Sequence, residues 1–409
     1  MKLTIKQKTV GFFVVLLLAI LFVMVIVIVI QKAVVGQKVR VELDRLGREN
    51  IGQIAIDVYN LCKISNDLLQ QKVNGDLNVA RYVLDRYGTV KLMQETVAWT
   101  VINQYTKEQR DVRLPKMSFG GKWLGQNRDL AVPTPIVDDV KKLVGGTCTI
   151  FQRMNTDGDM LRIATNVEEI DSTRAVSTYI PAMNPDREPN PVISAIMKGE
   201  TYRGRAYVVN DWYLTAYEPI LDESGNIIGV LYVGVRQESV ESLRQGIMDI
   251  TVGTDGYVFV LGGKGDQKGR YLISEGGLRD GEDIWEARDA NGRFFVMSII
   301  NKALMLTDNA LDYERYPWEY PGETEARMKI SAITYFAPWD WVIGAGVYED
   351  YYYQAQYRTD AALQRMQRWL LISAIIVFIA SAVIMYGMIN KISKPIEQSD
   401  NSSGFSETK

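Results

Sequence analysis

The sequence predicts an α+β chain in which two tandem modules of antiparallel sheet lie on a long N-terminal helix, between two transmembrane helices. Three observations predict this arrangement. Two uncharged apolar stretches lie near the ends of the 409-residue chain, at 10–30 and 369–389. A helical stripe of apolar residues follows the first stretch, and strand and turn patterns then occur twice, about 110 residues apart.

The first apolar stretch, 10–30, contains no charge and no proline, and about 20 helical residues span the ~30 Å hydrocarbon layer. A cleavable signal peptide would have an apolar core of about 7–15 residues and a small-residue cleavage site, and this stretch has neither. Lys2, Lys6 and Lys8 precede it, with no acidic residue before Glu42. Because positively charged flanks stay inside, we expect residues 1–9 to be cytoplasmic.

The second apolar stretch, 369–389, begins with Trp369, a typical interfacial anchor, and lysines follow it. Both lysine-bearing flanks therefore lie on one side of a bacterial inner membrane, and residues 31–368 are expected to be extracytoplasmic. Residues 351–368 contain no proline or glycine and are predicted to form a connecting helix. From Ser399 the chain is polar and Ser-rich, which predicts a disordered tail.

Residues 31–118 are predicted to be helical. From Gln31 to about Gln71, apolar residues recur at three- and four-residue steps, a stripe that suits the seam of a homodimer, the back of a domain, or both. A weaker helical pattern covers residues 79–118.

Strand patterns predict one module at 119–245 and a second at 246–350. The first opens with a hairpin (147–154 and 160–167), followed by a proline-rich loop, a short helix ending near Lys198 and three strands. The second has a hairpin, a helix at 294–304 and strands at 328–336 and 341–348. Phe151 and Val260 take similar places in the two units, and so do Gly234 and Gly346.

Composition excludes several classes of function. Lys and Arg total 46 against 49 Asp and Glu, which gives no electrostatic reason to expect a nucleic-acid partner. The chain has no histidine, which removes Ser-His-Asp and Cys-His nucleophiles, helical zinc-protease motifs and His-ligated haem. We therefore expect no catalytic residues, metal site or cofactor.

Cys62 and Cys148 form either a disulfide or, as we favour, two separate buried thiols.

In their order along the chain, these patterns resemble the double Cache sensors of bacterial methyl-accepting chemotaxis proteins, in the fused type-three/type-two variety. The matching motifs are 149–154 (TIFQRM), 160–166 (MLRIATN), 173–175 (TRA), 199–206 (GETYRGRA), 216–220 (AYEPI), 256–260 (GYVFV), 316–318 (YPW), 321–322 (PG) and 341–348 (WVIGAGVY). The resemblance covers residues 1–395, and it implies two PAS-like Cache modules, membrane-distal at 119–245 and membrane-proximal at 246–350. Residues 390–409 begin like a HAMP linker.

The resemblance implies a small ligand held between a sheet and its overlying loops. Without histidine, the polar contacts must come from arginine, lysine, tyrosine, other polar side chains or backbone amides. A guanidinium binds a carboxylate through two bonds, which predicts an organic acid or amino acid as ligand. Candidates in the membrane-distal module are Arg153, Arg162, Arg174, Tyr179, Arg205, Tyr207, Asp211, Trp212, Tyr213 and Tyr217. For each of them, strand packing or a solvated face is the alternative.

Candidates in the membrane-proximal module are Tyr257, Tyr271, Trp285, Tyr316, Trp318 and Lys329. Related modules often carry His-Pro after the second strand, where this chain has Ile273-Ser274-Glu275. Because of that departure, the alternative is a second module that binds no ligand and only transmits the signal.

The predicted function is the sensory region of a transmembrane chemoreceptor, which passes its signal to a cytoplasmic signalling domain or partner outside this chain. The input region of a sensor histidine kinase or cyclic-dinucleotide enzyme is the alternative of the same class. An extracytoplasmic enzyme and a structural surface protein are the alternatives of other classes.

Overall fold

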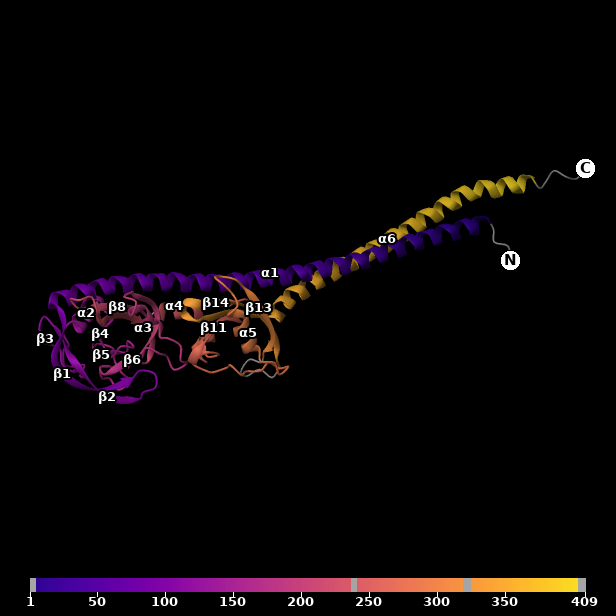
Figure 1. Ribbon diagram of the computed structural model, residues 1–409. Helices are drawn as coiled ribbons and strands as arrows, with labels where there is room; N and C mark the ends of the chain where they lie inside the picture. The colour runs from indigo at the N-terminus through magenta and orange to yellow at the C-terminus, as the bar shows by residue number, and fades with distance from the viewer. Residues whose placement is uncertain (1–4, 237–240, 319–324, 404–409) are drawn as a thin grey trace, which may run out of the picture.

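The computed structural model describes residues 5–236, 241–318 and 325–403; Lys2, the 321–322 motif and the last six residues of the predicted tail lie outside them. Helix α1 (Ile5–Tyr87) runs along one side of two sheet modules, and α6 (Glu349–Ser403) leaves the second module and extends beside the N-terminal half of α1 (Figure 1). The predicted connecting helix is confirmed. Helix α6 continues to Ser403, although the sequence predicted disorder from Ser399.

The first module (residues 90–236) is built on a nine-stranded sheet with the order β3-β2-β1-β6-β5-β4-β9-β8-β7. Its strands are β1 (Val90–Asn103), β2 (Gln109–Phe119), β3 (Lys122–Trp123), β4 (Thr147–Arg153), β5 (Met160–Thr165), β6 (Thr178–Ile180), β7 (Tyr202–Val208), β8 (Asp211–Leu221) and β9 (Ile227–Arg236). Helix α2 (Val137–Val144) lies between α1 and the sheet. Helix α3 (Pro191–Ile196) begins at Asn190, whose side chain accepts hydrogen bonds from the next two free backbone amides.

The helical prediction for residues 79–118 is wrong beyond Tyr87. Helix α1 ends there because Gly88 follows with a φ of 98°, a conformation that glycine adopts without strain. Strands β1 and β2 then pair antiparallel. In β1 the side chains of Trp99 and Val101 are buried while their neighbours are more exposed, so the period of the pattern is two, not 3.6.

The second module (residues 241–348) is built on a six-stranded sheet with the order β10-β11-β15-β14-β13, and β12 pairs with β11. Its strands are β10 (Thr251–Val252), β11 (Gly256–Gly262), β12 (Tyr271–Ile273), β13 (Asp312–Trp318), β14 (Arg327–Phe336) and β15 (Trp341–Tyr348). Its helices are α4 (Glu241–Met248), α5 (Phe295–Ala303) and the 3₁₀ turns η2 (Gly265–Gln267), η3 (Glu275–Gly277) and η4 (Ala337–Trp339). Strand β13 was not predicted from the sequence.

The predicted internal repeat is visible in the topology. Five strands follow the same order in each sheet, β5-β4-β9-β8-β7 in the first and β12-β11-β15-β14-β13 in the second. In both, the strand that opens the hairpin also pairs antiparallel with the last strand of its module. The two modules are therefore two versions of one fold.

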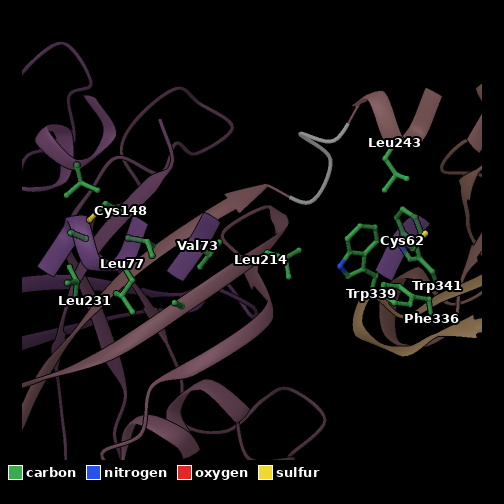
Figure 2. Packing of buried hydrophobic residues seen from close by; sticks show 14 of the residues in the cluster. Cys62, Val73, Leu77, Cys148, Leu214, Leu231, Leu243, Phe336, Trp339 and Trp341 are labelled. Carbon is green, nitrogen blue, oxygen red and sulfur yellow. The ribbon is translucent and has the colours of Figure 1, made fainter. Parts of the chain in front are cut away.

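Helix α1 is the shared back of both sheets. Figure 2 shows Val73 and Leu77 of α1 near Leu214 and Leu231 of the first sheet, and Cys62 farther along the helix near Trp339 and Trp341 of the second. The stripe of α1 that packs on the sheets includes Ile51, Ala55, Val58 and Cys62, all almost fully buried. One predicted role of the helix, the back of a domain, is confirmed.

The two cysteines are free and buried in different parts of this core, as we favoured over a disulfide. Both thiols lie where burial raises the pKa, so neither is poised as a nucleophile.

Among the described residues, two helices are long and apolar enough to cross a membrane, within the ranges Gly11–Tyr87 and Asp360–Met388. Their apolar windows are almost entirely exposed. A helix that is apolar all round and covered by no protein suits lipid far better than water.

Candidate ligand-binding sites

The first module has a second apolar core on the sheet face opposite α1. Alternate residues of a strand point to opposite faces, so Leu214 and Leu231 face α1 while Tyr213, Tyr217 and Tyr232 face the other way. Helix α3 and the loops around it cover the tyrosines. The Tyr217 and Tyr232 ring centroids lie 4.8 Å apart, and burial raises the pKa of both phenols, which stay neutral.

Arg162 on β5 is the charged residue in this core, with 1% of its surface exposed. One terminal nitrogen donates a hydrogen bond to the Thr178 hydroxyl, whereas Nε has no hydrogen-bond partner. The guanidinium carbon lies 4.9 Å from the centroid of the Phe151 ring, and no carboxylate of the described residues forms an ion pair with Arg162. Burial lowers its pKa. A buried cation without a counterion is costly, so an anion entering this core would be strongly stabilised.

Several polar residues in and around this core were missed from the sequence, among them Thr178, Tyr232, Gln104, Tyr105 and Asn190. Gln104 is 1% exposed and its Oε1 has no hydrogen-bond partner. The Tyr105 hydroxyl accepts a hydrogen bond of 3.3 Å from Asn190 Nδ2, and the Tyr105 ring stacks on Tyr207 with centroids 6.4 Å apart. Burial raises the pKa of Tyr105, and hydrogen bonds with Gln104 and Asn190 and the nearby charge of Arg162 oppose that rise. Gln104 and Tyr105 lie at the β1–β2 turn, in the segment that was predicted to be helical.

Two of the predicted arginines have structural partners instead. The Arg174 guanidinium makes two parallel bonds of 2.8 Å to the Asp138 carboxylate and further bonds to backbone carbonyls, so its donors are satisfied. Arg153 donates to the carbonyls of Asn155 and Thr156, each at 2.8 Å, and so closes its own hairpin turn. Both guanidinium groups are therefore held by these partners, away from the Arg162 core.

Arg205 lies where the two modules meet. Its guanidinium carbon is 3.8 Å from the Trp212 ring centroid, and Nη2 donates to Gln267 of the second module at 2.8 Å. Burial lowers the pKa of Arg205 to about 10, an effect that nearby Asp340 opposes. Arg205 therefore lies at the boundary with the second module and not beside Arg162, and its role in ligand binding stays a prediction.

Of the other predicted residues of the first module, Asp211 and Trp212 lie at the start of β8, Tyr207 lies near the end of β7, and Tyr179 is buried in the core shared with α1. The Arg236 Nε lies 3.5 Å from the Asp211 carboxylate and donates a hydrogen bond of 2.9 Å to the Tyr213 hydroxyl. The Tyr179 hydroxyl accepts a 3.3 Å hydrogen bond from Asn103. Of the ten predicted residues, the structure brings Arg162, Tyr213 and Tyr217 together on one core face.

The second module also holds a buried cation. Lys329 on β14 is 1% exposed, and its Nζ lies 3.4 Å from the Tyr257 ring centroid and 5.3 Å from that of Tyr348. Burial lowers the pKa of Lys329 to about 7. Gly346 leaves room for the side chain, because a Cβ at that position would lie 2.6 Å from Lys329 Cε. The glycine is needed here for the close approach of a lysine, not for a turn.

An aromatic cavity of about 10 Å³ adjoins this lysine, space for about one water molecule. Its aromatic walls are Tyr257, Phe259, Tyr271, Phe295, Tyr316 and Trp318. The Trp318 indole Nε1 is buried and has no hydrogen-bond partner. Five of the six predicted residues of this module therefore gather here. The sixth, Trp285, packs against the same core from the side and lies under Lys268.

Comparison with known proteins gives the following matches. The model of the Cache 3/Cache 2 fusion domain matches residues 37–362. The methyl-accepting chemotaxis protein McpP of Pseudomonas putida is 32% identical over 108 residues, which is 25% of this chain and 19% of McpP. The chain thus spans about a fifth of the length of that relative.

Solved structures are similar at a more distant level. The ligand-binding domain of the Campylobacter jejuni chemoreceptor Tlp3 in complex with L-valine is 11% identical, with a TM-score of 0.39, over 76% of this chain and 96% of that domain. A Cache chemosensory domain solved to explain carboxylic acid recognition is 20% identical, with a TM-score of 0.25, over 28% of this chain and 74% of that domain.

Proposed function

Because the chain belongs to the Cache 3/Cache 2 fusion family, we propose that it is the ligand-sensing region of a bacterial transmembrane chemoreceptor. The first module binds a small carboxylate, an amino acid or organic acid, with Arg162 as its counterion. The observation that carries this proposal is a guanidinium that is almost fully buried, lacks a carboxylate partner and keeps an unpaired Nε. Tyr217, Tyr232 and Gln104 supply the neighbouring polar groups. McpP, a chemotaxis protein by name, supports the chemoreceptor class.

A carboxylate fits Arg162 better than a neutral ligand for an energetic reason. A hydrogen bond between charged groups contributes about 1.5–3 kcal/mol, and the same contact neutralises a buried charge that is otherwise uncompensated. The neighbouring tyrosines have raised pKa values and stay neutral, so they do not compete with the ligand for the guanidinium.

The test uses the full chain in lipid nanodiscs and a panel of amino acids and organic acids. A ligand at 100 times its Kd stabilises the folded protein by about 2.7 kcal/mol, which thermal unfolding detects. We expect at least one carboxylate to stabilise the wild type and the Arg153→Met control, and to lose its effect in Arg162→Met. Equal stabilisation of Arg162→Met would place the site elsewhere.

The topology that we propose puts residues 31–368 outside the cytoplasm and both chain ends inside. Two exposed apolar helices flank the sheet modules, and lysines follow the second span at Lys391 and Lys394. A reporter enzyme that works only in the cytoplasm should be active when it is fused after Lys409, and one that works only outside the cytoplasm should be inactive there. An extracytoplasmic signal from that fusion would reject this topology.

The sensor is proposed to work as a homodimer through the exposed face of α1. Leu61, Ile64 and Leu68 follow each other at steps of three and four residues and are 38%, 57% and 61% exposed. Apolar side chains at this spacing form a helix seam. Disulfide crosslinking of an Ile64→Cys variant between two chains in membranes should succeed, whereas Lys63→Cys, one position round the helix, should crosslink less. Equal yields would argue against this seam. The signal is proposed to pass to a cytoplasmic signalling domain or partner.

A further inference from the structure

We propose that strand β13 couples the second module to helix α6, and that Arg315 on this strand is the residue that positions the helix. The inference goes beyond ligand sensing, because it concerns how a movement inside the module reaches α6, whichever module binds the ligand. It rests on the side chains of β13: one face of the strand contacts both long helices, and the other face lines the aromatic cavity.

The two faces of β13 move together. Alternate residues of a strand point to opposite sides of the sheet. Tyr316 and Trp318 point to the aromatic cavity, which both of them line. Arg315 lies on the opposite face, and its register partner Ile330 belongs to the core shared with α1. A shift of β13 that rearranges the aromatic core therefore also moves Arg315, because both faces belong to one backbone.

Arg315 holds the first residue of α6. Its Nε and Nη2 each contact a different oxygen of the Glu349 carboxylate. A two-point contact of this kind fixes orientation as well as distance. Glu349 is 9% exposed, so solvent and salt screen its charge little. The pair therefore determines where the first turn of α6 lies against the sheet and how the helix is rotated there.

Arg327 on the neighbouring strand β14 supplies a second attachment. Its Nε and Nη2 donate to the two oxygens of Asp350, each at 2.8 Å, and Nη2 also donates at 2.6 Å to Asp255 before β11. Its guanidinium carbon lies 3.9 Å from the ring centroid of Tyr348, the last residue of β15. The first two residues of α6 are thus each held by an arginine of the sheet, which makes the start of the helix a fixed joint.

Tyr313, on the same face as Arg315, attaches β13 to α1. Its hydroxyl donates a hydrogen bond of 3.2 Å to the Arg48 carbonyl, and the Arg48 guanidinium carbon lies 5.7 Å from the centroid of its ring. Gly52 permits this approach, since a Cβ at that position would lie 2.7 Å from the hydroxyl. Strand β13 therefore bridges the two long helices, and its position sets that of α6 relative to α1.

The fixed joint matters because α6 is continuous from Glu349 to Ser403. A displacement at the start of an unbroken helix reaches its far end, whereas a loose start absorbs it. Without its two arginine contacts the helix would keep the chain connection to β15, and a shift of β13 would be lost at that point.

Hydrogen exchange of the full chain in nanodiscs, without ligand, tests the attachment. The variants change the sheet and leave the helix sequence intact. Arg315→Gln removes the charge, and Arg315→Lys keeps the charge but replaces the planar two-point contact by a single ammonium. We expect amides in the first two turns of α6 to exchange about tenfold faster in Arg315→Gln, with Arg315→Lys between that variant and the wild type. Exchange in β11 should stay unchanged.

Arg270→Gln is the matched control, because it removes an ion pair with Asp283 in the same module and leaves Arg315 in place. Its α6 should exchange as in the wild type. The attachment is refuted if α6 exchanges alike in Arg315→Gln and the wild type. It is also refuted if β11 accelerates as much as α6, since that result would show a general loss of stability.

A chimera with a complete cytoplasmic signalling domain tests the coupling, and this arm alone rests on the proposed receptor function. Coupling between distant sites typically amounts to about 5–150-fold. We expect the ligand-free output of Arg315→Gln to differ from the wild type by about fivefold or more, with Arg315→Lys in between and Arg270→Gln unchanged. Equal output in Arg315→Gln and the wild type would overturn the coupling. A wild-type chimera without output would instead reject the receptor function, while the exchange arm still decides the attachment.

Discussion

Replacing Lys329 by methionine should make the stability of the second module depend less on pH. In the folded protein the Lys329 pKa is about 7, against 10.5 for the free side chain. Between these values the unfolded chain binds more protons than the folded one, so wild-type stability rises with pH across this window. Below about pH 7 the lysine is charged in both states, and the full cost of burying the ammonium is present.

The size of the effect follows from the shift. One pKa unit corresponds to about 1.36 kcal/mol, and integrating the proton difference from about pH 7 to about pH 9 gives about 2 kcal/mol. Lys329→Met lacks this contribution and should be the more stable protein at low pH, because it also removes the buried charge. The difference between the two proteins should shrink as the pH rises.

Tryptophan fluorescence of the full chain in nanodiscs, followed during thermal unfolding in carboxylate-free buffer, measures this. We expect the Tm difference between wild type and Lys329→Met to fall by several degrees from about pH 7 to about pH 9, since 1 kcal/mol shifts Tm by about 2–4 °C in a domain of this size class. Lys264→Met, with the same loss of formal charge at an exposed position, should follow the wild type. Parallel curves for wild type and Lys329→Met would refute the assignment of a depressed pKa to this lysine.

Three further predictions address structure and transmission. Asp138→Asn should destabilise the first module by about 3–5 kcal/mol, seen as a lower Tm, because it leaves the Arg174 charge buried without its partner; a Tm close to wild type would contradict the structural role given to that pair. Arg205→Ala should leave ligand affinity unchanged but weaken signalling in a chimera with a complete cytoplasmic domain, because it removes the bond to the second module; a large loss of affinity would return Arg205 to the ligand site. Inserting three glycines between Arg358 and Thr359 should preserve binding and abolish output, because α6 is one continuous helix and a coupling of about 1–3 kcal/mol is easily lost in a flexible joint; wild-type signalling would reject the rigid-helix account.

The sequence alone determined the parts of this protein that depend on local composition and period. Uncharged runs long enough to cross a membrane, hairpins marked by turn residues and strands rich in β-branched residues need no distant partner to be recognised. The repeat was likewise visible, since both modules use the same order of elements. The segment at 90–119 was misread because its weak apolar pattern fits a helix period as well as a strand period until its pairing partner is known.

Only the tertiary structure decided which charged residues have partners. Arg162 and Arg174 are equally buried and lie on neighbouring stretches of chain, yet Arg174 meets Asp138, 36 residues away, while Arg162 meets rings and one hydroxyl. The same holds for Lys329, whose surroundings come from three other strands and a glycine on β15. A pKa depends on burial and on charges brought close by long-range register, and neither can be read from the residues next to it in sequence.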